Sequence, residues 1–352
     1  MKKIILLIIL LFPITVNAIS ASAYIVMDAD SGRVLEGTNI HTEYFIASTT
    51  KIMTAVVVLN NTDIKKEIVI GEEVLKSYGS GIYVEVGEKI SVENLLYGLM
   101  LRSGNDAAIA LAHEISDSME GFAKLMNETS KIIGMENTLF LNSHGLEEAN
   151  KEGNKSTVYD MGLLSSYAIK NKDYAKITAT QKITVKTDFK TYVWNNKNKL
   201  LSSYEYCTGG KTGFTQLAKR TLVTNASKDN MNLTVVTFKD PNDFSNHESL
   251  YKKYFQSYKS YTLMEEGSIK TKYENTILSS PVRMTLSKSE YKNIKTRINY
   301  YDVNVTNIVG EFVVSLNGKD YIKEPIYLAS DAKTISKDDF WTKLKRKFGI
   351  NG

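Results

Sequence analysis

The 352-residue chain is poor in the side chains that build disulfide frameworks and metal centres. Its one cysteine, Cys207, excludes an intramolecular disulfide and a thiolate zinc cluster, because each needs at least two thiols. Four scattered histidines leave little material for any other metal site. We therefore expect neither a metal ion nor a cofactor, and we interpret Cys207 as a packed, idle thiol.

The chain also lacks a strong excess of charge of either sign. It has 44 basic and 39 acidic residues, which gives a formal net charge of +5. This small excess does not favour a nucleic-acid partner, which requires a concentrated basic surface. Shares of 43% hydrophobic and 24% charged residues are typical of a folded soluble protein. The length suits two domains, one large and one small.

The first 18 residues have the pattern of a secretory signal peptide. A short cationic start precedes the apolar run Ile4–Val16, and small residues occupy positions −3 and −1 before a cleavage point after Ala18. The alternative is an uncleaved membrane anchor, but the run is shorter than the ~20 apolar residues of a helical span, and Pro13 interrupts it. We predict cleavage after Ala18 or within residues 20–23, and an exported protein that acts outside the cytoplasmic membrane.

The last 22 residues, 331–352, differ in charge from the rest of the chain. They carry six basic and three acidic side chains, whereas residues 19–330 contain 36 of each. On a helix, four large apolar residues of this tail would share one face: Phe340, Trp341, Leu344 and Phe348. A basic helix with such a face is typical of a segment that lies in a membrane interface. We predict peripheral membrane contact through this tail, and a solvated chain end is the alternative.

Between the two ends, hydrophobic periodicity predicts an α+β architecture. A β-hairpin is expected from Ser22 to Leu35, and further strands are expected at 211–215, 220–226 and 231–239. Helices are expected at residues 47–59, 92–101, 106–115, 122–133, 159–170 and 248–258. Strands, then a block of helices, then a run of strands do not form an alternating βαβ order.

The region that follows has a different pattern. Short alternating strands with turns such as Asn317-Gly318 predict a small all-β unit. The predicted domains are a signal peptide at 1–18, a main domain at 19–262, a small β-rich domain at 263–330 and a basic amphipathic tail at 331–352.

Three short motifs in the main domain combine residues that can carry chemistry. They are Ser48-Thr49-Thr50-Lys51, Ser103-Gly104-Asn105 and Lys211-Thr212-Gly213. Each is weak alone, since Ser-x-x-Lys recurs three more times in this chain, and we interpret those copies as surface residues. Order and context are more informative: the first motif enters a buried helix, the second separates two helices, and the third lies on a strand.

The first motif can supply a nucleophile and its base. Residues three apart on a helix are neighbours, so Lys51 lies one turn from Ser48. A desolvated lysine can lose its proton and act as base for the hydroxyl, and N–H groups at a helix start can stabilise an oxyanion. Gly213 lets a ligand backbone approach its strand closely. The alternative makes Ser48 a helix N-cap and leaves Lys51 and Lys211 solvated.

With these motifs, the sequence resembles the serine-type D-alanyl-D-alanine carboxypeptidases, the low-molecular-mass penicillin-binding proteins, which share the three motifs with serine β-lactamases. The resemblance covers about residues 20–260 and includes further blocks at 24–28, 31–35, 95–100, 103–107, 122–127, 142–146 and 156–161. It implies a penicillin-binding/β-lactamase-like transpeptidase fold, with an antiparallel sheet and a helical cluster, followed by a small all-β domain. It also implies removal of the terminal D-alanine from peptidoglycan stem pentapeptides, with β-lactam antibiotics as acylating inhibitors.

The resemblance further implies the catalytic roles. Ser48 would be the nucleophile that forms the acyl-enzyme, and Lys51 its general base. Ser103 would relay protons to the leaving D-alanine, while Lys211 would tune the site and attract the substrate carboxylate. The oxyanion hole would consist of the N–H groups of Ser48 and Phe214.

The implied substrate-binding residues include Asn105 for the peptide amide and Thr212 for the terminal carboxylate, with Lys211, Gly213 and Phe214 completing the set. One departure stands out. Some members of the family carry an Arg before the last helix of this domain that grips the carboxylate, but residues 242–247 contain none. We interpret His247 as either its counterpart or a surface histidine.

Three other functions compete with this interpretation. A D,D-endopeptidase that cuts peptidoglycan cross-links would keep all three motifs. A class A β-lactamase would need a Glu-x-x-Leu-Asn segment after Ser103; Glu147 and Glu148 lie in the right region, but no Leu-Asn pair follows them. A non-catalytic wall-binding protein is disfavoured by the intact motifs.

Overall fold

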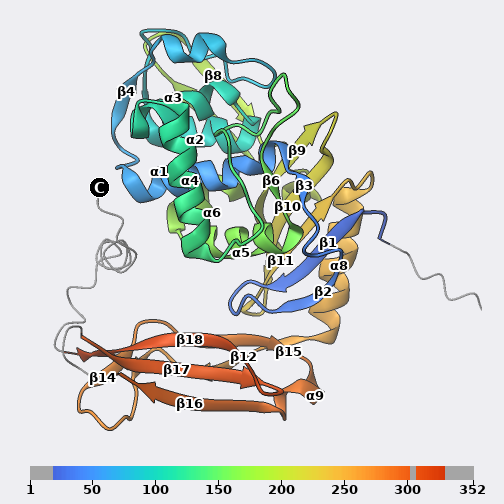
Figure 1. The fold of residues 1–352 in the computed structure, drawn as a ribbon, viewed down its shortest axis with the longest axis vertical. Coiled ribbons are helices and arrows are strands. Elements are labelled where there is room, and N and C mark those ends of the chain that lie inside the picture. Colours follow the sequence, from blue (N-terminus) through green and yellow to red (C-terminus); the bar gives the residue numbers. More distant parts are fainter. Residues whose placement is uncertain (1–18, 302–306, 330–352) are drawn as a thin grey trace, which may run out of the picture.

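The computed structural model describes residues 19–301 and 307–329. Figure 1 shows a cluster of helices at one end, a central sheet, and a second sheet-rich unit at the other end. Within the described ranges, no helix has both the length and the apolarity to cross a membrane. The predicted signal peptide and the whole of the predicted amphipathic tail lie outside the described residues.

The central sheet has five antiparallel strands in the order β2-β1-β11-β10-β9. Their bounds are β1 Ala23–Asp28, β2 Val34–Thr38, β9 Cys207–Thr215, β10 Lys219–Lys228 and β11 Met231–Phe238. The predicted hairpin and the three predicted later strands are confirmed. Asp229 and Asn230 both have positive φ, the backbone that a tight two-residue hairpin requires between β10 and β11. In the strand order given above, β9, which carries Lys211-Thr212-Gly213, is an edge strand.

Alternation along the strands divides the core between the two faces of this sheet. Ile25 and Val236 face a large core that also contains apolar residues of the helices α1 (Lys51–Asn61) and α5 (Val158–Ala168). Val26 and Val235 face a smaller core, against α8 (Asp243–Ser257). The sheet is thus covered on both faces, and its β9 edge borders the cleft described below.

Helices α1 Lys51–Asn61, α2 Val92–Tyr97, α3 Asn105–Ser116, α4 Met119–Ile133, α5 Val158–Ala168 and α6 Lys172–Ala179 form the helical cluster. The predicted end of α4 is confirmed, because Gly134 adopts the left-handed conformation as its C-cap. The helix expected at 92–101 changes character at Gly98, where the π-helical turn η3 (Gly98–Arg102) begins. Helix α8 begins at Asp243, five residues earlier than predicted, and therefore includes the buried His247.

Short elements that periodicity did not predict complete the main unit. They are β3 Tyr44–Phe45 with β6 Lys155–Ser156, β4 Glu67–Val69 with β5 Lys89–Ser91, β7 Lys182–Lys186 with β8 Thr191–Asn195, the 3-10 helices η1 Ala47–Thr50 and η2 Glu72–Lys76, and α7 Leu200–Ser203. The β7–β8 hairpin and α6 are the largest of the unpredicted elements.

The sheet-rich C-terminal region has its own apolar core, centred on Met284, Val314 and Ile326. Strand β12 Lys259–Met264 pairs with β15 Val282–Leu286, and a second sheet has the order β13-β14-β18-β17-β16. Its bounds are β13 Gly267–Ser268, β14 Thr276–Leu278, β16 Ile294–Tyr300, β17 Ile308–Leu316 and β18 Lys319–Leu328, with α9 at Lys288–Tyr291. The fold class, α+β followed by a β-rich region, is confirmed.

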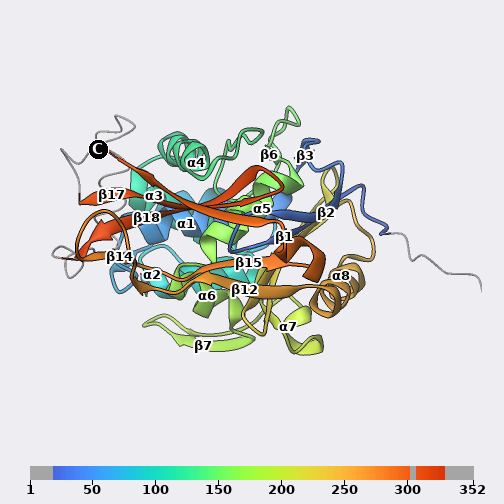
Figure 2. The same ribbon diagram turned by 90° about the horizontal axis from the view of Figure 1, so that it is seen from below.

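A buried carboxylate joins the two units at the turn after β1. Asp28 accepts hydrogen bonds from the backbone N–H of Thr285 at 3.0 Å, from its hydroxyl at 2.8 Å, and from the Ser31 hydroxyl. Arg33 forms an ion pair of 2.8 Å with Glu290 beside it. Figure 2 shows β1 and β15 close together in projection. We call Asp28 and its three donors the junction.

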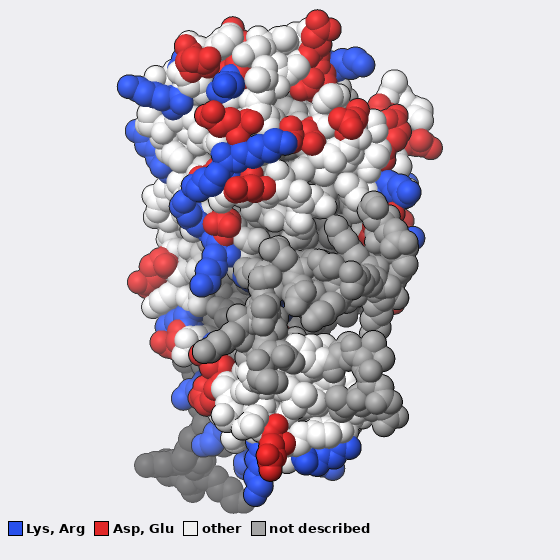
Figure 3. Space-filling model, turned by 90° about the vertical axis from the view of Figure 1, so that its left-hand side faces the viewer, with Lys and Arg blue, Asp and Glu red and all other residues white. Residues whose placement is uncertain are grey.

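The described surface mixes charges of both signs. On the face shown in Figure 3, acidic and basic side chains are interspersed. This agrees with the equal numbers of basic and acidic residues in 19–330.

Candidate active site

Ser48 lies in the short 3-10 helix η1, between β3 and α1. Strand β3 leads into η1, where Ala47 has a positive φ of 47°, and α1 follows directly. The carbonyl of Ile46 accepts hydrogen bonds from the Thr49 hydroxyl at 2.6 Å and the Thr221 hydroxyl at 3.1 Å. The interpretation of Ser48 as a helix N-cap is wrong, because Ser48 lies inside η1 and neither η1 nor α1 has a side-chain cap. Its hydroxyl is free to face the cleft.

Lys51 is completely buried beneath Ser48. Its Nζ donates to the Ser48 Oγ at 3.2 Å, the Asn105 Oδ1 at 2.7 Å and the His144 carbonyl at 2.7 Å. All three acceptors are uncharged, and no ion pair of Lys51 occurs within the described ranges. The lysine is therefore oriented by three oxygens without being paired to a carboxylate.

This setting holds the pKa of Lys51 well below its usual value. Burial is the main cause, because a cation loses its hydration, and repulsion from Lys211 and Lys197 adds to it. Attraction to Asp106 opposes the shift. A neutral amine beside the Ser48 hydroxyl can accept its proton.

The His144 carbonyl reaches Lys51 through a sharp turn at Gly145. The Asn142 Oδ1 accepts the Gly145 N–H at 2.7 Å, and Gly145 has a φ of 85°. A Cβ at Gly145 would lie 2.0 Å from the Ala47 carbonyl oxygen, so only glycine lets this segment pack against η1. The 142–146 block therefore shapes the wall behind Ser48.

Ser103 and Lys211 form a second hydroxyl–lysine pair. Ser103 follows the π-turn η3 in a left-handed conformation, with φ 66°, and α3 begins two residues later. The Lys211 Nζ donates to its Oγ at 3.1 Å and to the Thr212 carbonyl at 2.8 Å. The alternative that Lys211 is solvated is wrong, since Lys211 is 1% exposed. Burial first, and then repulsion from Lys197, lowers the pKa of Lys211 to about 7.

Gly213 brings the β9 edge against η1. A Cβ at this position would lie 3.0 Å from the Ser48 nitrogen and 2.4 Å from the Thr221 hydroxyl oxygen. The glycine thus permits close approach of the enzyme's own backbone to β9. Because β9 is an edge strand, its outward N–H and C=O groups can pair with an extended peptide beside Ser48.

The amide of Asn105 already has partners on both sides. Its Oδ1 accepts from Lys51, and its Nδ2 donates to the Tyr78 carbonyl at 2.6 Å. Asn105 is also buried. These contacts suit a residue that orients Lys51, in addition to the substrate contact that the resemblance implies.

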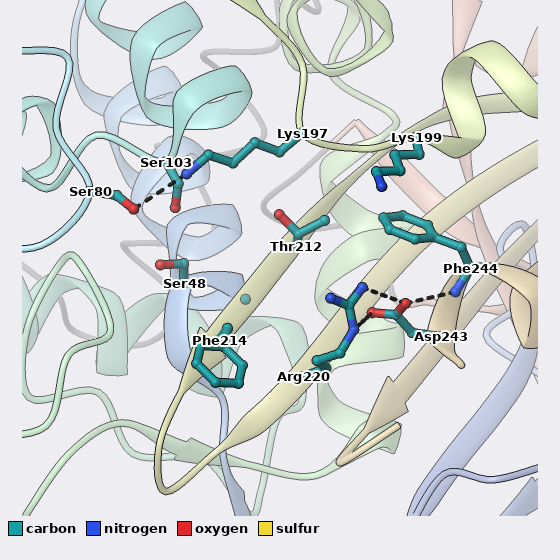
Figure 4. A pocket seen from close by; sticks show the side chains of 11 residues that line it. Ser48, Ser80, Ser103, Lys197, Lys199, Thr212, Phe214, Arg220, Asp243 and Phe244 are labelled. Carbon is teal, nitrogen blue, oxygen red and sulfur yellow. Dashed lines mark hydrogen bonds and ion pairs between the residues drawn. The ribbon is translucent and has the colours of Figure 1, made fainter. Parts of the chain in front are cut away.

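These groups surround a cleft of about 370 Å³. Figure 4 shows Ser48, Ser103, Thr212 and Phe214 around it. The predicted residues Ser48, Ser103, Thr212, Gly213 and Phe214 line the cleft, and Lys51, Asn105 and Lys211 lie buried behind them. The structure thus brings all eight predicted residues together.

The matches with known proteins agree with this geometry. A family model described as D-alanyl-D-alanine carboxypeptidase (Peptidase S11) matches residues 12–242. The chain belongs to this family. It is therefore a serine-type D-alanyl-D-alanine carboxypeptidase, a hydrolase.

Individual relatives extend the similarity beyond the main unit. The D-alanyl-D-alanine carboxypeptidase DacF of Bacillus subtilis is 30% identical over 94% of this chain and 89% of that protein. The structure of penicillin binding protein 5 from Haemophilus influenzae has a TM-score of 0.71 at 26% identity, and covers 88% of this chain and 97% of that one. A mutant of the Streptomyces K15 DD-transpeptidase has a TM-score of 0.63 at 31% identity, and covers 68% and 99%.

His247 does not line the active-site cleft of this carboxypeptidase. It is fully buried in α8, where its Nδ1 lies 2.7 Å from the Thr224 hydroxyl and its Nε2 lies 3.1 Å from the Thr237 hydroxyl. Burial lowers its pKa to about 3, so it is neutral. Cys207 is half-buried, and burial raises the pKa of its thiol. Both interpretations of His247 are therefore wrong, because it neither lines the cleft nor lies on the surface.

Sequence reasoning missed four charged residues of the cleft: Lys197, Lys199, Arg220 and Asp243. Lys197 follows the unpredicted β7–β8 hairpin, and its Nζ donates to the Ser80 hydroxyl at 3.3 Å. Arg220 forms an ion pair with Asp243 at 2.7 Å. The one available signal was that Arg220 begins the strand after Lys211-Thr212-Gly213, where antiparallel pairing places it beside that motif.

Proposed function

We propose that this carboxypeptidase is exported and removes the terminal D-alanine from peptidoglycan stem pentapeptides through an acyl-Ser48 intermediate. The observation that carries the proposal is the 3.2 Å contact between the Ser48 Oγ and a buried Lys51 Nζ that lacks an acidic partner in the described chain. A serine beside a lysine with a depressed pKa is an activated nucleophile.

In the first half-reaction, the Ser48 Oγ attacks the carbonyl carbon of the penultimate D-alanine. The neutral Lys51 Nζ takes the hydroxyl proton as the oxygen–carbon bond forms. The developing oxyanion accepts hydrogen bonds from the backbone N–H groups of Ser48 and Phe214. When the carbon–nitrogen bond breaks, Ser103 passes its proton to the nitrogen of the departing D-alanine and receives in its place the proton that Lys51 took from Ser48. Lys51 is then neutral again, and Lys211 donates a hydrogen bond to the Ser103 hydroxyl throughout.

In the second half-reaction, water replaces D-alanine. It attacks the acyl carbon and gives a proton to Lys51, which returns a proton to the Ser48 Oγ as the ester breaks. The products are a shortened stem peptide with a new carboxylate and the free enzyme. β-Lactam antibiotics would acylate Ser48 in the same first step.

Substrate binding uses the outer part of the cleft. The peptide pairs with the β9 edge, Thr212 binds the terminal carboxylate and the exposed Phe214 packs against the chain. A protonated Lys211 attracts the carboxylate from behind. A D,D-endopeptidase would use the same acylation step. It differs from a carboxypeptidase only in the leaving group, whose nitrogen belongs to a cross-linked peptide and not to free D-alanine.

Release of D-alanine from a diacyl-Lys-D-Ala-D-Ala peptide tests the proposed reaction. Wild-type protein should release D-alanine, whereas Ser48→Ala should release none above background while keeping the wild-type melting temperature. Equal release by both would contradict the proposed nucleophile. A cross-linked muropeptide dimer in parallel assays would measure the endopeptidase activity.

The proposal for the cellular site rests on the sequence of the chain ends. Cleavage after Ala18 or within residues 20–23 would release an exported protein, and residues 331–352 would hold it reversibly at the outer face of the membrane. We expect domains at 19–262 and 263–330 between them. Liposome sedimentation tests the membrane contact: full-length protein should pellet with anionic vesicles, and less so in high salt. Equal pelleting of a truncation after Ser330 would contradict it.

A further inference from the structure

Arg220 is held rigidly at the mouth of the active-site cleft. Its Nε donates to the Asp243 Oδ2 at 3.1 Å and its Nη2 to the Oδ1 at 2.7 Å. Asp243 is the buried first residue of α8, and its Oδ1 also accepts the Phe244 N–H at 2.8 Å. The guanidinium lies 5.6 Å from the centre of the Phe244 ring. Two hydrogen bonds and an aromatic contact therefore fix its orientation.

The strand pairing places this guanidinium on the substrate side of the cleft. Arg220 lies opposite Phe214 in the β9–β10 ladder, and Leu222 lies opposite Thr212. Directly opposed residues and residues two apart share a face of a sheet. Arg220, Phe214 and Thr212 therefore lie on one face, and Arg220 and Thr212 both line the cleft with Ser48.

One edge of the guanidinium remains available. Figure 4 shows the two hydrogen-bonded nitrogens turned to Asp243 and the remaining nitrogen, Nη1, turned towards the cleft. The planar fork of an arginine binds carboxylates with defined geometry, unlike the flexible ammonium of a lysine. Some members of the family carry an arginine in the segment that corresponds to 242–247. In this chain that segment contains no Arg or Lys, and it supplies Asp243, the carboxylate that holds Arg220.

We propose that Arg220, oriented by Asp243, binds the terminal carboxylate of the substrate together with Thr212 and so sets the requirement for a free carboxyl end. This inference rests on the proposed function, since it concerns the leaving-group side of the same cleft. Asp243 acts as a positioning residue, because it touches Arg220 and not the substrate.

The test compares two peptides that differ only at the carboxyl end. One is diacyl-Lys-D-Ala-D-Ala, and the other is the same peptide ending in D-alaninamide. Arg220→Gln should lower kcat/KM for the free acid by roughly 10- to 100-fold, because a charge-assisted hydrogen bond is lost. It should leave kcat/KM for the amide within about twofold, because the amide makes no such contact.

Two further variants separate binding from folding. Arg220→Gln alone leaves the buried Asp243 carboxylate without its cation, so the double variant Arg220→Gln/Asp243→Asn removes both charges and should show the same loss of preference. Arg220→Lys keeps the charge without the fork and should retain part of the preference. The matched control is Lys219→Gln, which removes an exposed charge from the neighbouring position of β10, on the opposite face.

The outcomes divide clearly. A double variant that keeps the wild-type ratio of acid to amide, or loses both substrates equally, would overturn the inference. If wild-type protein cleaves neither peptide, the proposed substrate is wrong, and acylation by benzylpenicillin and by its methyl ester then provides the same comparison. A wild-type preference for the free acid of penicillin that Arg220→Gln abolishes would support the inference, and failure of wild-type protein to react with either would reject it.

Discussion

The active-site cleft and the junction both bury a charged group, but their neighbours act in opposite directions. At the junction, burial raises the pKa of Asp28, and hydrogen bonds from Ser31 and Thr285 oppose that shift. At Lys51, burial lowers the pKa, and the charges of Lys211 and Lys197 lower it further. The neighbours of Asp28 thus stabilise its charge, whereas the neighbouring lysines destabilise the charge of Lys51.

This difference separates structural from chemical use of a buried charge. Hydrogen-bond donors around a carboxylate offset its lost hydration, and the result is a fixed contact between two parts of a chain. Two further lysines near a buried lysine do not stabilise the charged form, and the result is an amine that loses its proton more easily than an ordinary lysine. Changes at the first site should therefore affect folding, and changes at the second should affect reactivity.

Replacement of Lys51 should have the largest effect. Lys51→Ala and Lys51→Arg should each lower the acylation rate constant by ~10³-fold, because neither side chain can accept the Ser48 proton. Stopped-flow acylation by a chromogenic β-lactam measures this rate constant, and circular dichroism checks the fold. A well-folded Lys51→Arg protein with near-normal acylation would mean that charge alone is needed at this position.

Replacement of Asp28 should have a smaller effect, on a different quantity. Asp28→Ala leaves the Thr285 N–H without its acceptor in the interior, so we expect the free energy of unfolding to fall by about 2–3 kcal/mol. Activity per folded molecule should stay within about twofold. Urea unfolding and activity assays at low temperature measure the two quantities. Lost activity in a protein of wild-type stability would erase the distinction between the two sites.

The smallest predicted effect is a shift in pH dependence. Removal of the Lys197 charge in Lys197→Gln should raise the pKa of both Lys51 and Lys211, because its repulsion lowers both. In kcat/KM, deprotonation of Lys51 gives the rising limb, and loss of the Lys211 charge gives the falling limb, near pH 7 in the wild type. Both limbs should therefore move to higher pH. Lys199→Gln provides a comparison, since it removes a cleft cation that contributes to neither shift.

Much of the framework could be predicted from local pattern. The hairpin from Ser22 to Leu35 and the strands that end the main unit follow alternation, which depends on one buried face. The three motifs could be placed on a helix start, a helix break and a strand for the same reason. The prediction that the three motifs meet in one cleft came from the family resemblance, because residue spacing says nothing about distances between separate elements.

The remaining features depend on tertiary contacts. The apolar pattern around Leu99 predicts an ordinary helix. It indicates neither the π-turn before Ser103 nor the left-handed conformation of Ser103. The two partners of the Asn105 amide come from segments 54 and 27 residues away. The buried His247 has its two hydrogen-bond partners, Thr224 and Thr237, on neighbouring strands, and no local pattern around residue 247 predicts those contacts.

The mass of the intact protein after incubation with benzylpenicillin tests the central claim most directly. The account predicts a persistent increase equal to one penicillin molecule, which maps to the peptide that contains Ser48 and is absent from Ser48→Ala. No adduct, an adduct on another residue, or an unchanged adduct in Ser48→Ala would contradict the claim that Ser48, activated by Lys51, is the nucleophile.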